Sequence, residues 1–99
     1  MPLPLEPTMV ATTDEISGYR ITRTLGVAEG FGVTIYTGIF PGGQKAILID
    51  TMREAFLDML TAAASQGATA IVGLRYAIPA SDRERIILAY GTAVVVSRL

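Results

Sequence analysis

The strongest constraint on the fold is a long run without a charged side chain near the end of the sequence. No Asp, Glu, Lys or Arg lies between Arg85 and Arg98, and the intervening residues are rich in valine and isoleucine. These residue types favour strands, and a strand that is apolar on both faces has to be covered on both faces. Residues 86–97 are therefore predicted to form the central strand of a sheet.

A single long helix is predicted in the middle of the chain. Its apolar residues recur at the three- and four-residue spacing of one helical face: Met52, Ala55, Phe56, Met59, Leu60 and Ala63. Thr51 and Glu54 fit a capping box, and Gly67 stands where a left-handed C-terminal cap belongs. The apolar face indicates that this helix packs against the sheet.

The start of this helix has two interpretations. Leu48 continues the apolar stripe backwards towards a Pro-Gly-Gly turn at 41–43, which favours a helix that begins near Gln44. Ile47 and Ile49 are β-branched, so a strand at 45–49 is the alternative. The helical interpretation is favoured because its period holds.

Two further strands are predicted on either side of the helix. Residues 19–29 alternate between apolar and polar side chains with a break at Arg23, and Gly26 marks a bulge or a close backbone approach. Residues 68–78 alternate in the same way and end at Pro79. The Gly30-Phe31-Gly32 segment and the Gly42-Gly43 pair are interpreted as turns.

The N-terminus has a different composition from the rest of the chain. Residues 1–8 hold three of the five prolines, which predicts an extended or loose arm. A single domain then spans residues 9–99, and residues 9–13 could add a short strand to it.

Together these elements predict a two-layer α+β subunit in the order strand, helix, strand, strand. With the last strand central, the three-stranded sheet is antiparallel and the helix covers one face. The other face and two strand edges stay open, and only 17% of the residues are charged, against ~25% in typical domains. The simplest cover for so small a domain is another copy of itself, so a homo-oligomer is predicted.

The composition argues against several classes of function. A net charge of -1 without a basic run excludes a nucleic-acid partner. The chain has no cysteine and no histidine, which removes the ligands that soft metals prefer and the commonest catalytic groups. No spacing singles out a general base, so no catalytic residue, metal or cofactor is predicted. No signal peptide or membrane span is recognised, which predicts a cytoplasmic protein with no membrane partner.

Two candidate ligand sites remain. The free N–H groups of a helix that begins near Gln44 could hold an anion together with Gly42 and Gly43, although paired glycines are more simply turns. Tyr76 and Tyr90 lie on adjacent predicted strands, where they could stack a flat ligand between subunits or serve as buried core or interface residues.

Three carboxylates share one face of the predicted helix. Asp50, Glu54 and Asp58 are spaced four residues apart, which is compatible with a Mg or Ca site. The simpler interpretation is a solvated acidic stripe paired with Arg53.

Five short segments occur in an order that is specific as a set. They are Thr12-Thr13, Ile16 with Gly18-Tyr19-Arg20-Ile21, Leu25-Gly26-Val27, Gly67-Ala68 with Ala70-Ile71-Val72-Gly73, and Gly91-Thr92-Ala93-Val94-Val95. This set resembles the YbjQ family, once labelled heavy-metal-binding, over residues 9–29 and 51–97. The chain departs from the family between Gly30 and Asp50, where the family has a longer charged segment with an arginine at its Gly-Gly turn.

The resemblance implies a dodecin-like subunit assembled into a ring, a pentamer in the family, with unknown function. The function hypothesis is therefore a YbjQ-like protein that forms a homo-oligomeric ring and binds a small-molecule ligand between subunits. The rival hypotheses are a small enzyme whose active site exists only in the oligomer, and a purely structural assembly protein.

Overall fold

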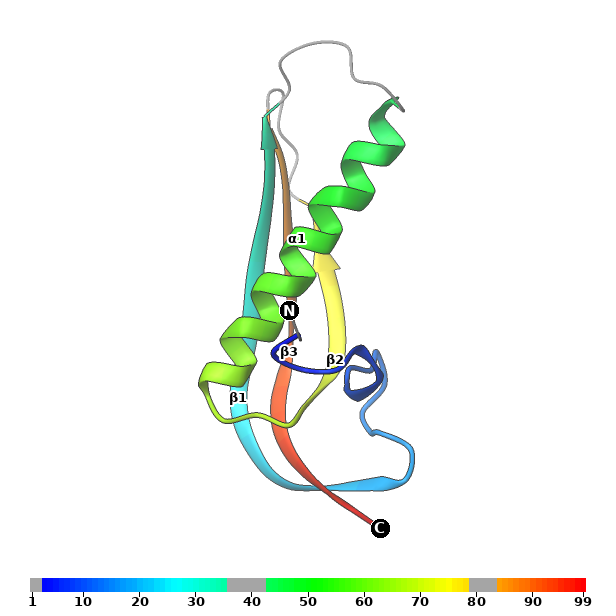
Figure 1. The fold of residues 1–99 in the computed structure, drawn as a ribbon, viewed down its shortest axis with the longest axis vertical. Helices are drawn as coiled ribbons and strands as arrows, with labels where there is room; N and C mark the ends of the chain where they lie inside the picture. Colours follow the sequence, from blue (N-terminus) through cyan, green and yellow to red (C-terminus); the bar gives the residue numbers. More distant parts are fainter. Residues whose placement is uncertain (1–2, 36–42, 79–83) are drawn as a thin grey trace.

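The structure is a computed structural model of the 99-residue chain, and it describes residues 3–35, 43–78 and 84–99. A short 3-10 helix at Pro7–Met9 precedes strand β1 (Tyr19–Ile35), helix α1 (Gly43–Ser65), strand β2 (Ala70–Ala77) and strand β3 (Glu84–Arg98), as Figure 1 shows. The predicted α+β class and the order strand, helix, strand, strand are confirmed.

The three strands form one sheet in the order β1-β3-β2, and both pairings are antiparallel. The uncharged run therefore lies in the central strand, as predicted from its two apolar faces. Strands β1 and β3 continue past the end of β2, because β2 pairs no further along β3 than Leu88 while β1 reaches Glu84. The upper part of the sheet in Figure 1 is thus a two-stranded ribbon.

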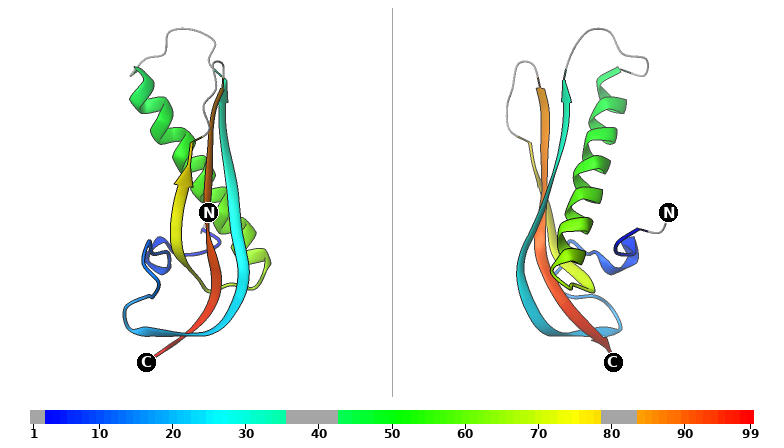
Figure 2. Two further views of the ribbon diagram at one scale, coloured as in Figure 1. Left: turned by 180° about the vertical axis from the view of Figure 1, so that it is seen from behind. Right: turned by 60° about the vertical axis from the view of Figure 1, so that its left-hand side comes forward.

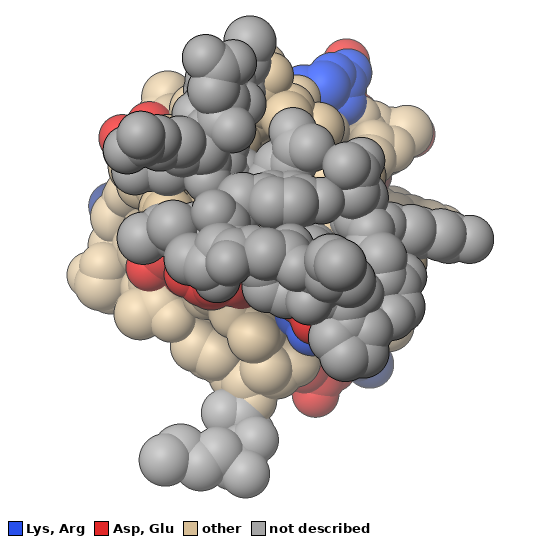
Figure 3. All heavy atoms as spheres, turned by 90° about the horizontal axis from the view of Figure 1, so that it is seen from above, with Lys and Arg blue, Asp and Glu red and all other residues tan. Residues whose placement is uncertain are grey.

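The molecule is elongated for its size. Its radius of gyration is 15.0 Å and its extents are 50 × 24 × 22 Å, whereas a compact chain of this length has a radius of about 13 Å. Figure 3 looks down the long axis, and the acidic and basic atoms visible there lie in small groups among uncharged atoms. The two-stranded upper part is the reason for the length.

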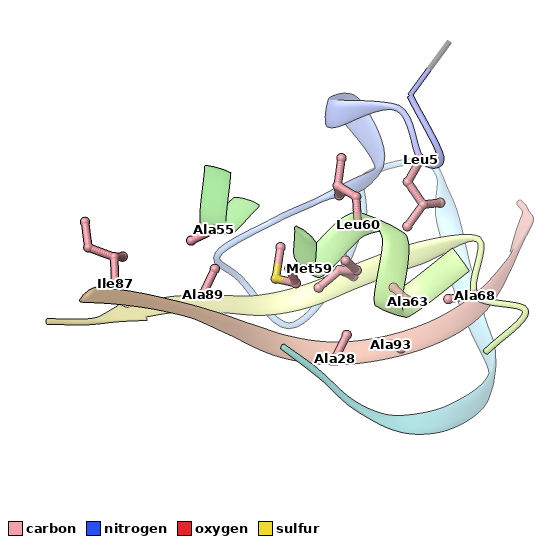
Figure 4. Packing of buried hydrophobic residues seen from close by; sticks show 11 residues of the cluster. Leu5, Ala28, Ala55, Met59, Leu60, Ala63, Ala68, Ile87, Ala89 and Ala93 are labelled. Atoms are coloured by element: carbon pink, nitrogen blue, oxygen red, sulfur yellow. The ribbon is translucent and has the colours of Figure 1, made fainter. Parts of the chain in front are cut away.

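Helix α1 covers one face of the sheet, which we call the front face; the back face is the opposite one (Figure 2). Small and medium side chains fill the contact, and Figure 4 shows them between the helix and the strands: Ala28, Ala55, Met59, Ala63, Ile87, Ala89 and Ala93. Leu60 projects from the other side of the helix, towards Leu5 of the N-terminal segment. The helix ends at Ser65, and Gly67 is the predicted left-handed cap residue, with a φ of 87°. The N–H of Ala68 donates to the carbonyl of Ala63 (3.1 Å), which closes a Schellman cap.

The helix begins at Gly43, which confirms the longer helical interpretation and overturns the alternative strand at 45–49. The capping box predicted at Thr51 and Glu54 is wrong for the same reason. Thr51 lies two turns inside the helix and is fully buried against the sheet.

The prediction of a turn at Gly30-Phe31-Gly32 is also wrong, because these residues lie within β1. A Cβ at Gly30 would meet the backbone nitrogen of Met59, and one at Gly32 would meet the backbone oxygen of Thr51. Only glycine allows the helix backbone to approach the strand this closely. Gly26 does mark a bulge, as predicted, with a φ of 129° at a shift in the β1–β3 register.

The N-terminal segment wraps around the outer edge of β2. Leu5 is buried in the core of the front face, while Ile16 is buried on the back face against β2 and β3. Between them, the N–H of Ala11 donates to Ile71 O (2.9 Å) and the N–H of Gly73 donates to Thr13 O (2.8 Å). The short strand considered for residues 9–13 is reduced to a single parallel bridge at Val10.

Candidate functional site

The upper part of the back face carries large apolar side chains that no described part of the chain covers. Val27, Phe31 and Val33 of β1 are 65%, 52% and 45% exposed. Because side chains alternate along a strand and Gly30 and Gly32 face the helix, these residues point to the opposite side. We call Val27, Glu29, Phe31 and Val33 of β1, with Leu88 and Tyr90 of β3, the open face.

A row of polar side chains crosses the open face. Glu29 pairs with Tyr90 across β1 and β3, and Tyr90 pairs with Arg75 across β3 and β2. The Nη1 atom of Arg75 donates to Thr12 O (2.8 Å) and to Leu74 O (2.7 Å). Its guanidinium is thus held at the β2 edge, and Glu29 is an exposed carboxylate in the apolar stripe of β1.

The outer edge of β1 is partly covered by side chains of the helix. The N–H of Phe31 donates to Asp58 Oδ2 (2.9 Å), and Gln66 Nε2 donates to the carbonyl of Val27 (3.1 Å). These bonds occupy backbone groups that a neighbouring strand would otherwise use. Helix α1 therefore both packs on β1 and protects its edge.

The structure does not bring the predicted ligand residues together. Gly42 lies outside the described residues, while Gly43 and Gln44 form the first turn of α1 at the upper end of the molecule. Tyr76 pairs with Ala89 and packs into the front-face core, where burial raises the pKa of its hydroxyl. Tyr90 stands on the back face and is 37% exposed. A ligand bound on one face of a subunit can contact only one of the two tyrosines.

The acidic stripe of α1 is exposed at Asp50, Glu54 and Asp58. Asp58 accepts a hydrogen bond from the N–H of Phe31 in β1. Within the described ranges, no group of three or more His, Cys, Asp or Glu side chains is placed to hold a metal ion. A search of the same residues finds no helix with the length and hydropathy of a membrane span.

The open face was missed because residues 30–35 were not recognised as strand. The signal was present as an alternation of small residues at 28, 30 and 32 with larger ones at 27, 29, 31 and 33. Two glycines in such a pattern favour a turn on propensity alone, and only the packed helix shows why they are needed.

Comparisons with known proteins agree with the resemblance. A family model described as "Putative heavy-metal-binding", YbjQ_1, matches residues 41–97. UPF0145 proteins of Burkholderia mallei strain SAVP1 and Burkholderia pseudomallei strain 668 are each 34% identical to this chain over 108 residues, which covers 94% of this chain and 96% of the relative.

A solved structure is similar in fold. It is a protein of unknown function from Pediococcus pentosaceus ATCC 25745, assigned to the DUF74 family, with a TM-score of 0.69 and 16% identity over 89% of this chain and 96% of that chain. At this identity the likeness shows the fold alone. With the near full-length sequence relatives and the match over residues 41–97, it follows that the chain belongs to the YbjQ/UPF0145 family.

Proposed function

We propose that this protein is a subunit of a homo-oligomeric ring and that the open face is a contact between subunits. The observation that carries the proposal is the exposed stripe of Val27, Phe31 and Val33 on the back of β1, with Glu29 between Val27 and Phe31. Each side chain of this size contributes roughly 1.5–3 kcal/mol when it is fully buried. Because these side chains are already partly buried, a subunit gains the remaining part of this energy only by association.

The covered part of the back face supports the same proposal. Further down the sheet, Ile16, Met9 and Ala11 of the N-terminal segment pack on Val72 and Val94. The segment reaches the polar row only at Arg75, through the carbonyl of Thr12, and Val27, Phe31 and Val33 remain exposed. A second copy of the chain supplies the missing cover, and a ring of five, as the family resemblance implies, uses every open face.

A small-molecule ligand between subunits remains part of the proposal. Of the two predicted tyrosines, Tyr90 is the one that the open face presents to a neighbouring subunit. A flat ligand would stack on its ring, with Arg75 and Glu29 in the same row across the sheet. The proposed location of the ring is the cytoplasm.

Native mass spectrometry and light scattering of the purified protein test the proposal. We expect a mass near five times the 10.5 kDa subunit, and any retained ligand as an additional mass. Phe31→Asp should convert the assembly to monomers with an unchanged circular dichroism spectrum. Leu99→Asp changes an equally apolar side chain that is 82% exposed at the chain end, and it should leave the assembly intact. A monomeric wild-type protein would contradict the proposal.

A further inference from the structure

The N-terminal segment is joined to β2 at the bulge in that strand. Gly73 and Leu74 lie at the shift in the β2–β3 register, and Gly73 has a φ of 68°. The N–H of Gly73 donates to Thr13 O (2.8 Å), and the N–H of Leu74 donates to Ala11 O (3.0 Å). The bulge therefore presents two consecutive N–H groups to the N-terminal segment, whereas a regular strand presents only every second one to a given edge.

Arg75 adds a third donor beside these two N–H groups. Its Nη1 atom donates to Thr12 O (2.8 Å) and is oriented by a second bond to Leu74 O (2.7 Å). Three consecutive carbonyls, at 11–13, thus accept hydrogen bonds from three consecutive residues, at 73–75. The bond from the guanidinium involves a charged donor and is the strongest kind of the three.

Two apolar side chains hold the ends of the segment on opposite faces of the sheet. Leu5 is 8% exposed in the front-face core, where Leu60 of α1 projects towards it (Figure 4). Ile16 is also 8% exposed and packs with Val94 on the back face. We call residues 5–16 the N-terminal strap, because it crosses the edge of β2 from one face to the other.

The strap is connected to the rest of the molecule by a short exposed link. Ser17 and Gly18 lie between the strap and β1, and both are exposed. Gly18 has a φ of 82°, which glycine adopts without strain. The link therefore provides a pivot next to the strap.

The sheet and the helix hold together without the strap. Strand β2 pairs with β3 along Ala70–Ala77, and α1 packs on β1 and β3 through side chains that lie between these elements. We propose that the strap opens about Gly18 as one unit while α1 and the three strands stay folded, and that Arg75 sets how often it opens. Opening uncovers an unpaired edge of β2, with which another extended chain can pair. This inference does not depend on the proposed oligomer.

Hydrogen exchange of the full-length protein, followed by NMR at one protein concentration, tests the inference. The amide of Ala11 donates to Ile71 O (2.9 Å), so together with those of Gly73 and Leu74 it gives three strap amides. These three should share one degree of protection, at least about tenfold below that of the slowest amides of β3. Protection equal to that of β3 would mean that the strap opens only when the whole chain unfolds, and it would overturn the proposal.

Arg75→Ala tests whether the guanidinium controls the opening. Loss of a hydrogen bond from a charged group should speed the exchange of the three strap amides by about tenfold. Arg20→Ala is the matched control, because Arg20 is also exposed and its Nε donates elsewhere, to Ser97 Oγ (3.4 Å). The control should change these rates by less than about twofold. Equal effects of the two variants would overturn the role of Arg75.

Ile16→Val tests whether the strap opens as one unit. It weakens only the back-face end of the strap, yet all three strap amides should exchange about fivefold faster if that end is released with the rest. Fraying from the N-terminus, with Ile16 left in place, would leave their rates at the wild-type values. That result would overturn opening as one unit.

Ile87→Val tests whether the core stays folded when the strap opens. Ile87 is fully buried in the front-face core, and Figure 4 shows it at the opposite end of the cluster from Leu5. The variant weakens a contact that is present with the strap closed or open, so the slowest β3 amides should exchange about fivefold faster while the strap amides stay within about twofold. An equal increase at the strap amides would show that strap opening disrupts the core, and it would overturn the proposal. Circular dichroism checks the folding of every variant.

Discussion

The two faces of β1 differ in what they are built to contact. On the front, Gly30 and Gly32 lie so close to α1 that a Cβ at either position would meet helix backbone. On the back, one residue further along in each case, Phe31 and Val33 carry large apolar side chains that stay about half exposed. In this part of β1, one face is thus packed against the helix and the other is exposed.

This difference separates the contacts that fold the subunit from those that remain for association. The front face uses the smallest residues, because its partner, helix α1, belongs to the same chain and packs with its backbone close to the strand. The back face uses side chains that gain free energy only when a further surface covers them. Assembly into the proposed oligomer should therefore be separable from folding by mutation.

Val94→Asp should have the largest effect, because it places a carboxylate in the covered part of the back face. Val94 is 1% exposed and packs with Ile16, Ala70 and Val72. An unpaired charge in such a site costs several kcal/mol, a large share of the 5–15 kcal/mol that stabilises a typical domain. We expect loss of soluble, folded protein, measured by expression and circular dichroism.

Val27→Asp is the matched control, since the same substitution falls on the open face. Val27 is 65% exposed, so the carboxylate stays in water in the isolated subunit. The variant should fold and fail to assemble. A folded Val94→Asp protein would contradict the burial of β3, and an unfolded Val27→Asp protein would contradict the division between the covered part and the open face.

Gly30→Ala should have the next largest effect, because the added methyl group collides with helix backbone that cannot rotate away. Its Cβ would lie 2.6 Å from the carbonyl oxygen of Ala55. We expect the free energy of unfolding to fall by about 3 kcal/mol, the upper end of usual overpacking costs. Gly91→Ala is the comparison, because its closest contact is the Cγ2 methyl of Ile71 at 2.7 Å. That side chain can shift, so a loss as large as that of Gly30→Ala would contradict the explanation.

Much of the fold could be predicted from local pattern. The uncharged run of β3 identified the central strand, the apolar period identified α1, and Gly67 identified its end. The uncharged run and the apolar period reflect the burial of apolar side chains. Gly67 reflects a left-handed backbone conformation that favours glycine. The capping box failed because Thr51 satisfies the pattern at a position where the helix continues.

The candidate site could be predicted much less well. Gly30 and Gly32 are read as a turn until the helix that packs on them is known, so the strand that carries the open face was shortened. Tyr76 and Tyr90 lie on neighbouring strands as predicted, but the bulge in β2 between Val72 and Arg75 helps to set which face each side chain takes. A bulge changes facing by one residue, and sequence alternation alone does not reveal it.

Asp58→Ala should have the smallest effect, confined to the edge of β1. The substitution removes the acceptor of the Phe31 N–H, an exposed hydrogen bond that contributes about 1 kcal/mol. Urea unfolding at fixed protein concentration should show a loss of this size. Asp50→Ala, two turns earlier on the same exposed side of α1, should change the free energy of unfolding by less than about 0.5 kcal/mol.

Hydrogen exchange shows whether the loss in Asp58→Ala is local. The amide of Phe31 should exchange faster in this variant, while the amides that pair β1 with β3 keep their protection, because they face the interior of the sheet. If Phe31 exchanged at the wild-type rate, another group would be covering the edge of β1. If a neighbouring subunit covered this edge, the amide at position 31 would keep its slow exchange in the assembly. It would lose this protection in monomers that also carry Phe31→Asp. The measurement on both forms thus tells whether side chains of the helix or a second subunit protect this strand.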